Sequence, residues 1–383
     1  MLTTIAIAAF VLLVLGIPMW MIFLLLAIIG MTWQGVSMEV VVQGLAGTIN
    51  KLVLLAVPGF IFAGGVMGEG GMSARLIAWV SALIGRVPGG MALTTVTAAE
   101  LFGAISGSSA ATVAGLGKIL YPALLKEGYG ERFSLGLITS SGAIAIIIPP
   151  SITMILFAVM SNASLGKLYL AGFLPGIVVG ICAGVYCVWY ALKHKITSGR
   201  TWDLKEIVRT TREVFWTMGA PVVIFGGIYG GFMTPTEASM AVSVYAVIVS
   251  VYIYRELTWK AIWNITRDTA LLSAKVFIIV AASGVFSWIL TAEAVPQKMV
   301  GVIDAMELSP VIVLLMINIV LLIVGMFSPP FGLNIFVSCS IFNKTSSAVV
   351  SGLWPFFVAY GIALAIVTYV PWLSLVLPNL LMK

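Results

Sequence analysis

The sequence predicts an all-α polytopic membrane protein made of two similar halves that contain helical hairpins and broken helices. Of its 383 residues, 61% are hydrophobic and only 9% are charged, whereas a soluble domain is about half apolar and a quarter charged. The apolar segments are spread over the whole chain, so a single membrane anchor is excluded. Backbone groups in lipid must be paired within their own segment, so these segments are expected to be helices.

Long apolar runs mark the simple membrane spans. The first run lacks the basic start and the cleavage site of a signal peptide, so we interpret it as the first span. The runs predict spans at 2–30, 40–66, 169–192, 215–232, 237–254, 269–291, 309–327 and 352–379.

The apolar interval 73–162 is interrupted by many glycines and by the pair Pro149–Pro150. Such interruptions favour a helical hairpin at 88–125 and a broken helix at 132–162. Non-helical backbone at membrane depth is tolerated only where it is buried in protein or lines a cavity. With the preceding scaffold helices, these elements make up the first half, residues 1–192.

A basic connection at 193–213 divides the chain nearly in half. Net charge is +6, and basic residues in short connections are typical of cytoplasmic loops, so topology explains the charge better than nucleic-acid binding does. Residues 203–213 are compatible with a short amphipathic helix at the membrane surface. Docking of a partner is the alternative interpretation of this segment.

The second half, residues 214–383, repeats the spacing of the first. The second proline of each pair, Pro150 or Pro330, precedes a later proline, Pro175 or Pro355, by 25 residues in both halves. A glycine lies at offset 22 each time. Interrupted segments at matching positions of two halves indicate a transporter binding site.

The repeat fails at one place, 327–328. Gly103 precedes its proline pair by 46 residues, whereas Gly325 precedes Pro329 by only 4. The second hairpin is therefore expected to be shortened by roughly 42 residues. A native deletion, an engineered deletion and a gap closed by renumbering are the explanations, which the Cα–Cα distance between Phe327 and Ser328 would distinguish.

Small hydroxyl residues cluster at the interruptions. Ser106–Ser109 and the segment from Thr139 to Ser151 combine hydroxyls, glycines and carbonyls that are freed by proline, and these oxygens suit an alkali cation. A half-helix N-terminus beside them favours an anionic group. The alternative for Ser106–Ser109 is a helix-packing surface. Thr236 and Glu237 also suit a helix cap.

Charges within apolar surroundings are few, and each costs about 2.5–3.5 kcal/mol at the membrane centre. They are expected to have a partner or a cavity, and Glu100 and Lys275 are the most informative. The three cysteines lie in apolar runs and His194 lies in a basic loop, so disulfides, multi-histidine metal sites and a histidine triad are not supported. The full set of such charges is Glu69, Arg75, Arg86, Glu100, Lys118, Glu237, Lys275 and Glu293.

Four strings in the same order resemble the large membrane (M) subunit of tripartite ATP-independent periplasmic (TRAP) transporters, the DctM-like family. They are FGAISGSSAATVAGLG (102–117), IIPPSITMIL (147–156), YGGFMTPTEAS (229–239) and PPFGLNIF (329–336). The resemblance implies inverted repeats in an elevator-type, ion transporter superfamily-like fold. It also implies that the absent tip of the second hairpin would alter a second sodium site.

The same resemblance implies where sodium and substrate bind. The first hairpin tip, the first proline break, the threonines of the third string and the second proline motif would line one site, with sodium as the metal at the same positions. The residues carried over are Ser106, Gly107, Ser108, Ser109, Thr139, Ser140, Gly142, Pro149, Pro150, Ser151, Thr234, Thr236, Pro329, Pro330, Gly332 and Asn334.

The function implied is that of a permease subunit in a sodium-coupled secondary transporter of organic acids, of the dicarboxylate, sialic acid or sugar-acid type. Expected partners are a small four-helix membrane subunit (Q-type), a periplasmic substrate-binding protein (P-type) and the lipid bilayer of a bacterial inner membrane, with no nucleic acid. Na⁺ is the coupling ion and no cofactor is expected. The alternatives are an ion channel or an intramembrane serine enzyme, in which Ser108 would be the nucleophile and Lys118 its base.

Overall fold

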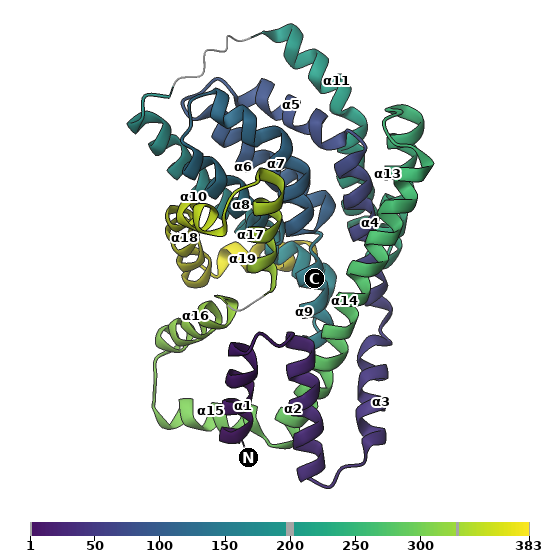
Figure 1. Cartoon of the computed structure of the whole chain (residues 1–383), viewed down its shortest axis with the longest axis vertical. Helices are drawn as coiled ribbons and strands as arrows, with labels where there is room; N and C mark the ends of the chain where they lie inside the picture. Colours follow the sequence, from purple (N-terminus) through teal and green to yellow (C-terminus); the bar gives the residue numbers. More distant parts are fainter. Residues whose placement is uncertain (1, 197–202, 327–328, 383) are drawn as a thin grey trace. The chain divides into compact units, whose positions relative to one another are not determined.

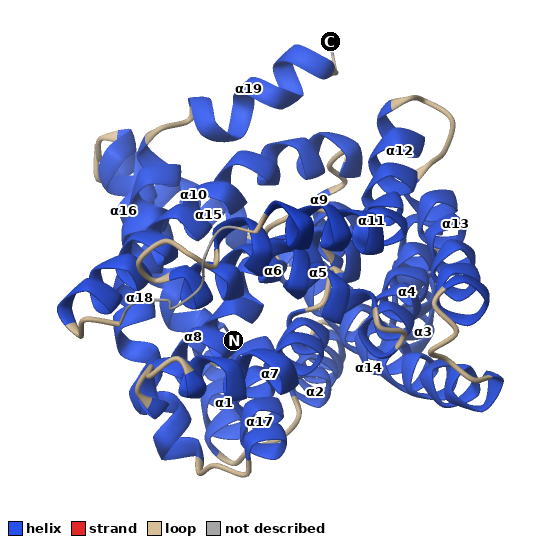
Figure 2. Cartoon of the chain, turned by 90° about the horizontal axis from the view of Figure 1, so that it is seen from above, coloured by secondary structure: helices blue, strands red, loops and turns tan. Residues whose placement is uncertain are grey.

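The computed structural model describes residues 2–196, 203–326 and 329–382. All regular secondary structure in these ranges is helical (Figure 2). Five of the described helices are long and apolar enough to cross a membrane, which confirms the predicted helical, multi-span class. These spans are Leu52–Glu69, Leu165–Lys193, Pro235–Ile253, Trp259–Ala292 and Ser346–Tyr369.

The chain forms two compact units, and each takes residues from both sequence halves. Unit 1 comprises residues 1–55 and 270–319, and unit 2 comprises residues 56–269 and 320–383. Helices α14 and α16 contribute to both units. The helices of unit 1 are α1 (Leu2–Val14), α2 (Met19–Trp33), α3 (Met38–Ile49), the second part of α14 (Trp259–Ala292), α15 (Val295–Ala305) and the first part of α16 (Pro310–Met326).

Unit 1 is held together by packing of α14 on α2 and α3. Val285 and Ile289 are buried with Met31 and Val41. Glu293 accepts a hydrogen bond of 2.6 Å from Nε2 of Gln34, so this acidic residue of an apolar region has a polar partner, as expected.

Unit 2 contains the interrupted helices. The first hairpin is α6 and α7, and the broken helix is α8 and α9 (Figure 1). Besides the first part of α14 and the second part of α16, the helices of unit 2 are α4 (Ala56–Glu69), α5 (Met72–Ile84), α6 (Gly90–Ser106), α7 (Ser109–Lys126), α8 (Glu131–Ala145), α9 (Ile152–Ser161), α10 (Leu165–Lys193), α11 (Leu204–Pro221), α12 (Gly227–Tyr229), α13 (Pro235–Ile248), α17 (Pro329–Phe342), α18 (Ser346–Tyr369) and α19 (Trp372–Leu381).

The single spans predicted at 2–30, 40–66 and 352–379 are wrong, because each is two helices. In the first, Gly16 has a positive φ of 75° and Pro18 follows, so α1 ends and α2 begins. In the second, α3 ends before Asn50 and a short 3₁₀ turn leads into α4. In the third, Pro371 separates α18 from α19. Glycine and proline interrupt helices even in strongly apolar sequence.

The amphipathic helix predicted at 203–213 is present as the first part of α11. Asp203 caps it by accepting a hydrogen bond of 2.9 Å from the backbone N–H of Lys205. The helix continues to Pro221, beyond the predicted connection. The junction at Phe327–Ser328 lies outside the described residues.

Candidate functional site

The first hairpin turns at Gly107. Helix α6 ends at Ser106, Gly107 adopts a left-handed conformation with φ of 58°, and Ser108 is the N-cap of α7. The Ser108 hydroxyl accepts from the backbone N–H of Ala111. The turn therefore lies at the small-residue cluster that the sequence predicts as a hairpin tip.

Hydroxyl groups are concentrated and buried at this tip. Oγ of Ser106 lies 3.2 Å from Oγ1 of Thr112, and the Thr112 hydroxyl donates to the carbonyl oxygen of Ser108 at 2.9 Å. Ser106 and Thr112 are buried. The tip thus presents hydroxyl and carbonyl oxygens in a largely dehydrated setting.

The broken helix is interrupted between Ala145 and Ile152, at the proline pair. The Ser151 hydroxyl donates to the carbonyl oxygen of Ile146 at 2.5 Å, and the Thr153 hydroxyl donates to the same oxygen at 3.3 Å. Side-chain hydroxyls therefore satisfy a carbonyl that the interruption frees.

The hairpin tip lies directly against this break. The backbone N–H of Ile152, the first residue of α9, donates to the carbonyl oxygen of Gly107 at 3.3 Å. A Cβ built on Gly107 would lie 2.6 Å from the carbonyl oxygen of Pro150. The N-termini of α7 and α9 consequently meet at one place, and their dipoles favour a negative charge there.

The second half contributes helix α17 to the same place. Oγ of Ser109 donates to Oδ1 of Asn334 at 2.7 Å, and both side chains are buried. One turn further along α17, Oγ of Ser338 lies 2.7 Å from Oγ1 of Thr139. The structure therefore brings the first hairpin tip, the first proline break and the second proline motif together.

Two further helices, α10 and α18, pack against the broken helix. A Cβ on Gly172 of α10 would lie 2.8 Å from the carbonyl oxygen of Ile147, so only a small residue allows this approach. The hydroxyl of Tyr360 on α18 donates to the carbonyl oxygen of Ser140 at 3.0 Å. Gly142 of α8 has no side chain, and this allows Val113, Asn334 and the carbonyl oxygen of Ser109 to lie close to the α8 backbone.

For the other predicted site residues, no described contact joins them to this cluster. Thr234 is exposed, and with Glu237 it forms a capping box at the start of α13, with the Thr234 N–H donating to Oε2 of Glu237 at 2.7 Å. The Thr236 carbonyl accepts from the Ser239 hydroxyl. A Cβ on Gly332 would meet nothing within 4 Å. Pro329 and Pro330 begin α17, and their side chains lie outside the described residues.

Four hydroxyl-bearing residues with contacts at the cluster were not predicted from the sequence: Thr112, Thr153, Ser338 and Tyr360. Ser338 is four residues after Asn334 in an apolar helix, so helical spacing of polar residues is the signal that would have found it. Thr112 carries the same signal relative to Ser108. Tyr360 gives no such signal, because its partner on α8 is distant in sequence.

The donor set at the cluster consists of hydroxyl, amide and carbonyl oxygens. Within the described ranges, no group of three or more His, Cys, Asp or Glu side chains is placed to hold a metal ion. A cation bound here would therefore have hard, uncharged oxygen ligands, which suit alkali cations better than zinc or copper.

A separate groove of about 460 Å³ lies between α6 and α10. It is lined mainly by apolar side chains, including Leu93, Val96, Ile177 and Ile181, together with the carboxyl of Glu100. None of its lining residues belongs to the predicted site.

Comparison with known families gives a match over nearly the whole chain. The model described as "Tripartite ATP-independent periplasmic transporter, DctM component" matches residues 6–328 and 324–373. The two matched segments meet at 324–328, where the sequence analysis expects missing residues.

Several curated proteins are similar over most of their length. The ectoine TRAP transporter large permease protein TeaC of Halomonas elongata is 36% identical over 423 aligned positions, covering 99% of both chains. The C4-dicarboxylate TRAP transporter large permease protein DctM of Pseudomonas aeruginosa is 32% identical, covering 87% of both. The 2,3-diketo-L-gulonate TRAP transporter large permease protein YiaN of Escherichia coli is 33% identical, covering 82% of this chain and 74% of that protein.

Proposed function

The chain belongs to the DctM component family of tripartite ATP-independent periplasmic transporters, and from this membership we propose that it is the permease subunit of a sodium-coupled importer of organic acids. Members of this family are transporter permease subunits and not enzymes, so the serine-enzyme alternative is set aside. The observation that carries the proposal is the meeting of the α7 and α9 N-termini at buried hydroxyls, beside Asn334 of the other half.

The proposed substrate is an organic acid because of the electrostatics of this cluster. Two helix N-termini favour an anionic group, while hydroxyl and carbonyl oxygens favour a hard cation. The named solutes of the relatives, which are ectoine, C4-dicarboxylates and 2,3-diketo-L-gulonate, each carry a carboxylate. We assign the sodium ion and the carboxylate to the same cluster, where each would offset the charge of the other.

The proposed mechanism is of the elevator type, in an inverted-repeat architecture within a bacterial inner membrane. The matched proline and glycine spacing of the two halves supports it, as does the contact of a first-half hairpin with second-half helix α17. The proposed partners are a small four-helix membrane subunit and a periplasmic binding protein, consistent with a tripartite family.

The second hairpin is proposed to be shortened near 327–328. The two-part family match supports missing residues there. The alignment of 423 positions is 40 positions longer than this 383-residue chain, which agrees with a deletion of about that size. Because the second hairpin would complete a symmetrical clamp on the solute, its loss would weaken transport more than it weakens binding of sodium at the first hairpin.

Two measurements test the proposal. Sodium is expected to raise the melting temperature of the purified chain relative to potassium, and a sodium gradient is expected to drive uptake of radiolabelled organic acids when partner proteins are added. Ser106→Leu places a bulky apolar group at the buried tip and should abolish both effects. Ser351→Leu, at an exposed serine of α18, is the matched control and should retain them. Equal stability in sodium and potassium would refute the assignment of this tip.

A further inference from the structure

Glu100 is an acidic side chain that the proposed transport site does not use. It lies on α6, the first arm of the hairpin, and its carboxyl faces the groove between α6 and α10. The groove is lined largely by aliphatic side chains. A Cβ built on Gly180 of α10 would collide with Oε1 of Glu100, so the carboxyl is in close contact with the α10 backbone.

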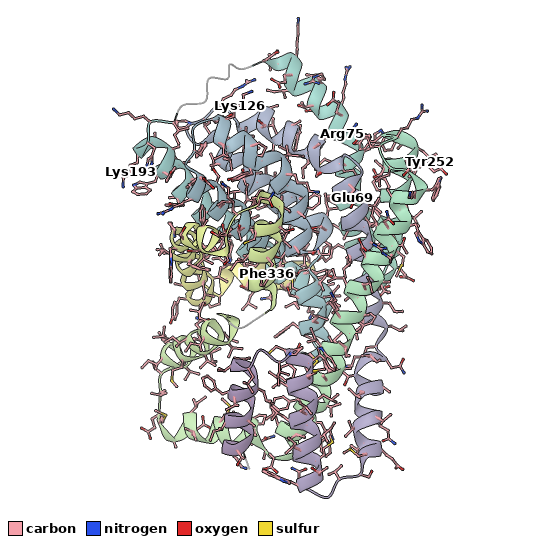
Figure 3. All side chains as sticks on the ribbon, in the orientation of Figure 1. Glu69, Arg75, Lys126, Lys193, Tyr252 and Phe336 are labelled. Carbon is pink, nitrogen blue, oxygen red and sulfur yellow. The ribbon has the colours of Figure 1, made fainter. Side chains whose placement is uncertain are left out.

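No ion pair to Glu100 is formed by any described residue. The helices that pack on α6 are α4, α5, α7, α8, α10 and α11, and Tyr360 of α18 is a titratable group close enough to interact with the carboxyl electrostatically. Arg75 pairs with Glu256 at 2.6 Å. Arg75, Lys126 and Lys193 lie at one end of unit 2 (Figure 3). The remaining charged side chains of these packed helices are exposed: Glu69, Lys118, Lys126, Glu131, Arg132, Lys167, Lys193, Lys205, Glu206, Arg209, Arg212 and Glu213.

An ionised carboxylate in such a position is unfavourable. An unpaired charge in apolar surroundings within a membrane costs several kcal/mol, and neutralisation by a proton removes most of this cost. None of the residues that line the groove belongs to the hydroxyl cluster at the hairpin tip, so the carboxyl of Glu100 is separate in place from that cluster.

We propose that Glu100 is a proton-binding site on the first hairpin, distinct from the sodium and substrate cluster. The protonated carboxyl is neutral and compatible with the apolar groove, so the hairpin arm packs on α10 in this form. Loss of the proton places a charge against the α10 backbone at Gly180 and disfavours that packing. Transport then depends on pH through Glu100.

Infrared spectroscopy of the full chain in lipid nanodiscs tests proton binding directly. The wild type should show a protonated-carboxyl absorption that declines as the pH is raised from about 5 to about 9. Glu100→Gln should lack this absorption, while the matched control Glu69→Gln, at an exposed carboxyl on α4, should keep it. Identical spectra for Glu100→Gln and the wild type would overturn the proposal.

The effect on transport is a second measurement, and it alone rests on the proposed function. Uptake by the wild type, with partners present, should fall as the pH is raised, by up to about tenfold per pH unit once the carboxyl ionises. In Glu100→Gln this decline should be absent, and Glu100→Asp should restore it. If the pH profile of uptake is the same in Glu100→Gln as in the wild type, the Glu100 proposal is contradicted. If the wild type shows no uptake at all, the proposed function is contradicted, and the infrared result still tests proton binding at Glu100.

Discussion

Ser109 and Asn334 are 225 residues apart in the sequence, and Oγ of Ser109 donates a hydrogen bond of 2.7 Å to Oδ1 of Asn334. Ser109 is the first residue of the α7 arm, and Asn334 lies on α17 of the second half. Both side chains are buried. This hydrogen bond therefore joins the first hairpin tip to the other half at the proposed site.

A double-mutant cycle on this pair measures its strength. Ser109→Ala and Asn334→Ala are each expected to destabilise the chain. Their coupling energy should be about 0.6 kcal/mol, the mean for hydrogen bonds between membrane helices, and no more than about 1.7 kcal/mol. The measurement is reversible denaturation in detergent micelles. As a control, Ser109→Ala combined with Thr345→Ala, at an N-cap of α18, should be additive. A coupling energy of zero for Ser109 and Asn334 would mean that the contact is not formed.

Gly107→Ala tests the seating of the tip on the broken helix. Gly107 has a positive φ of 58°, which is unfavourable for any residue with a Cβ. The Cβ of an alanine here would also lie 2.6 Å from the carbonyl oxygen of Pro150. Gly231 has a φ of 75° with nothing within 4 Å of a built Cβ, so Gly231→Ala carries only the conformational cost of about 1–2 kcal/mol. We expect Gly107→Ala to lower the free energy of unfolding by at least about 1 kcal/mol more than Gly231→Ala does. Equal losses would place the tip away from Pro150.

Thr234→Ala distinguishes a capping residue from a sodium ligand. Because the Thr234 hydroxyl accepts from the Glu237 N–H in the capping box, its loss should destabilise the chain by about 0.5–2 kcal/mol. Thr234→Ser should restore stability. The stabilisation by sodium, measured as a shift in melting temperature, should persist in Thr234→Ala. If that shift disappears while the helix content is unchanged, Thr234 faces the ion as the sequence analysis expects.

The ion pair between Lys344 and Glu131 gives a pH dependence. Nζ of Lys344 lies 2.6 Å from Oε1 of Glu131, and this hydrogen bond and the carboxylate charge raise the pKa of Lys344. A raised folded-state pKa stabilises the fold below the unfolded pKa of about 10.4 and loses its effect as the pH rises through the folded value. The melting temperature of Glu131→Gln should therefore lie slightly below that of the wild type at neutral pH and converge with it at strongly alkaline pH. A constant difference across this range would show that the pair does not act through charge.

Gly180→Ala reports on the close contact with Glu100. A Cβ at Gly180 would collide with the Glu100 carboxyl, whereas at Gly184 it would lie 3.1 Å from Cδ2 of Leu93, the flexible end of an aliphatic side chain. We expect Gly180→Ala to lower the melting temperature clearly more than Gly184→Ala, since overpacking against a polar group costs about 1–3 kcal/mol. A double variant, Gly180→Ala with Glu100→Ala, should recover much of the loss. Lack of recovery would place Glu100 elsewhere.

The helical class and the two main interruptions, at Gly107 and at Pro149–Pro150, could be predicted from the sequence. Inside a bilayer each segment must satisfy its own backbone hydrogen bonds, so apolar runs become helices. Breaks follow from local chemistry: Gly107 can adopt a positive φ, and the Pro149–Pro150 pair removes two backbone donors. The same local effects were underestimated at Gly16 and Pro371, where predicted single spans became pairs of helices.

Which polar groups meet depends on the packing of the helices and could not be predicted. The pairing of Ser109 with Asn334, and of Thr139 with Ser338, depends on how α7, α8 and α17 pack. No local signal specifies a partner some 200 residues away. The helix cap at the start of α13 is local by contrast, because the Thr234 hydroxyl accepts from the N–H of Glu237 three residues later. The sequence analysis expects Thr236 in this role, two residues too far along the chain.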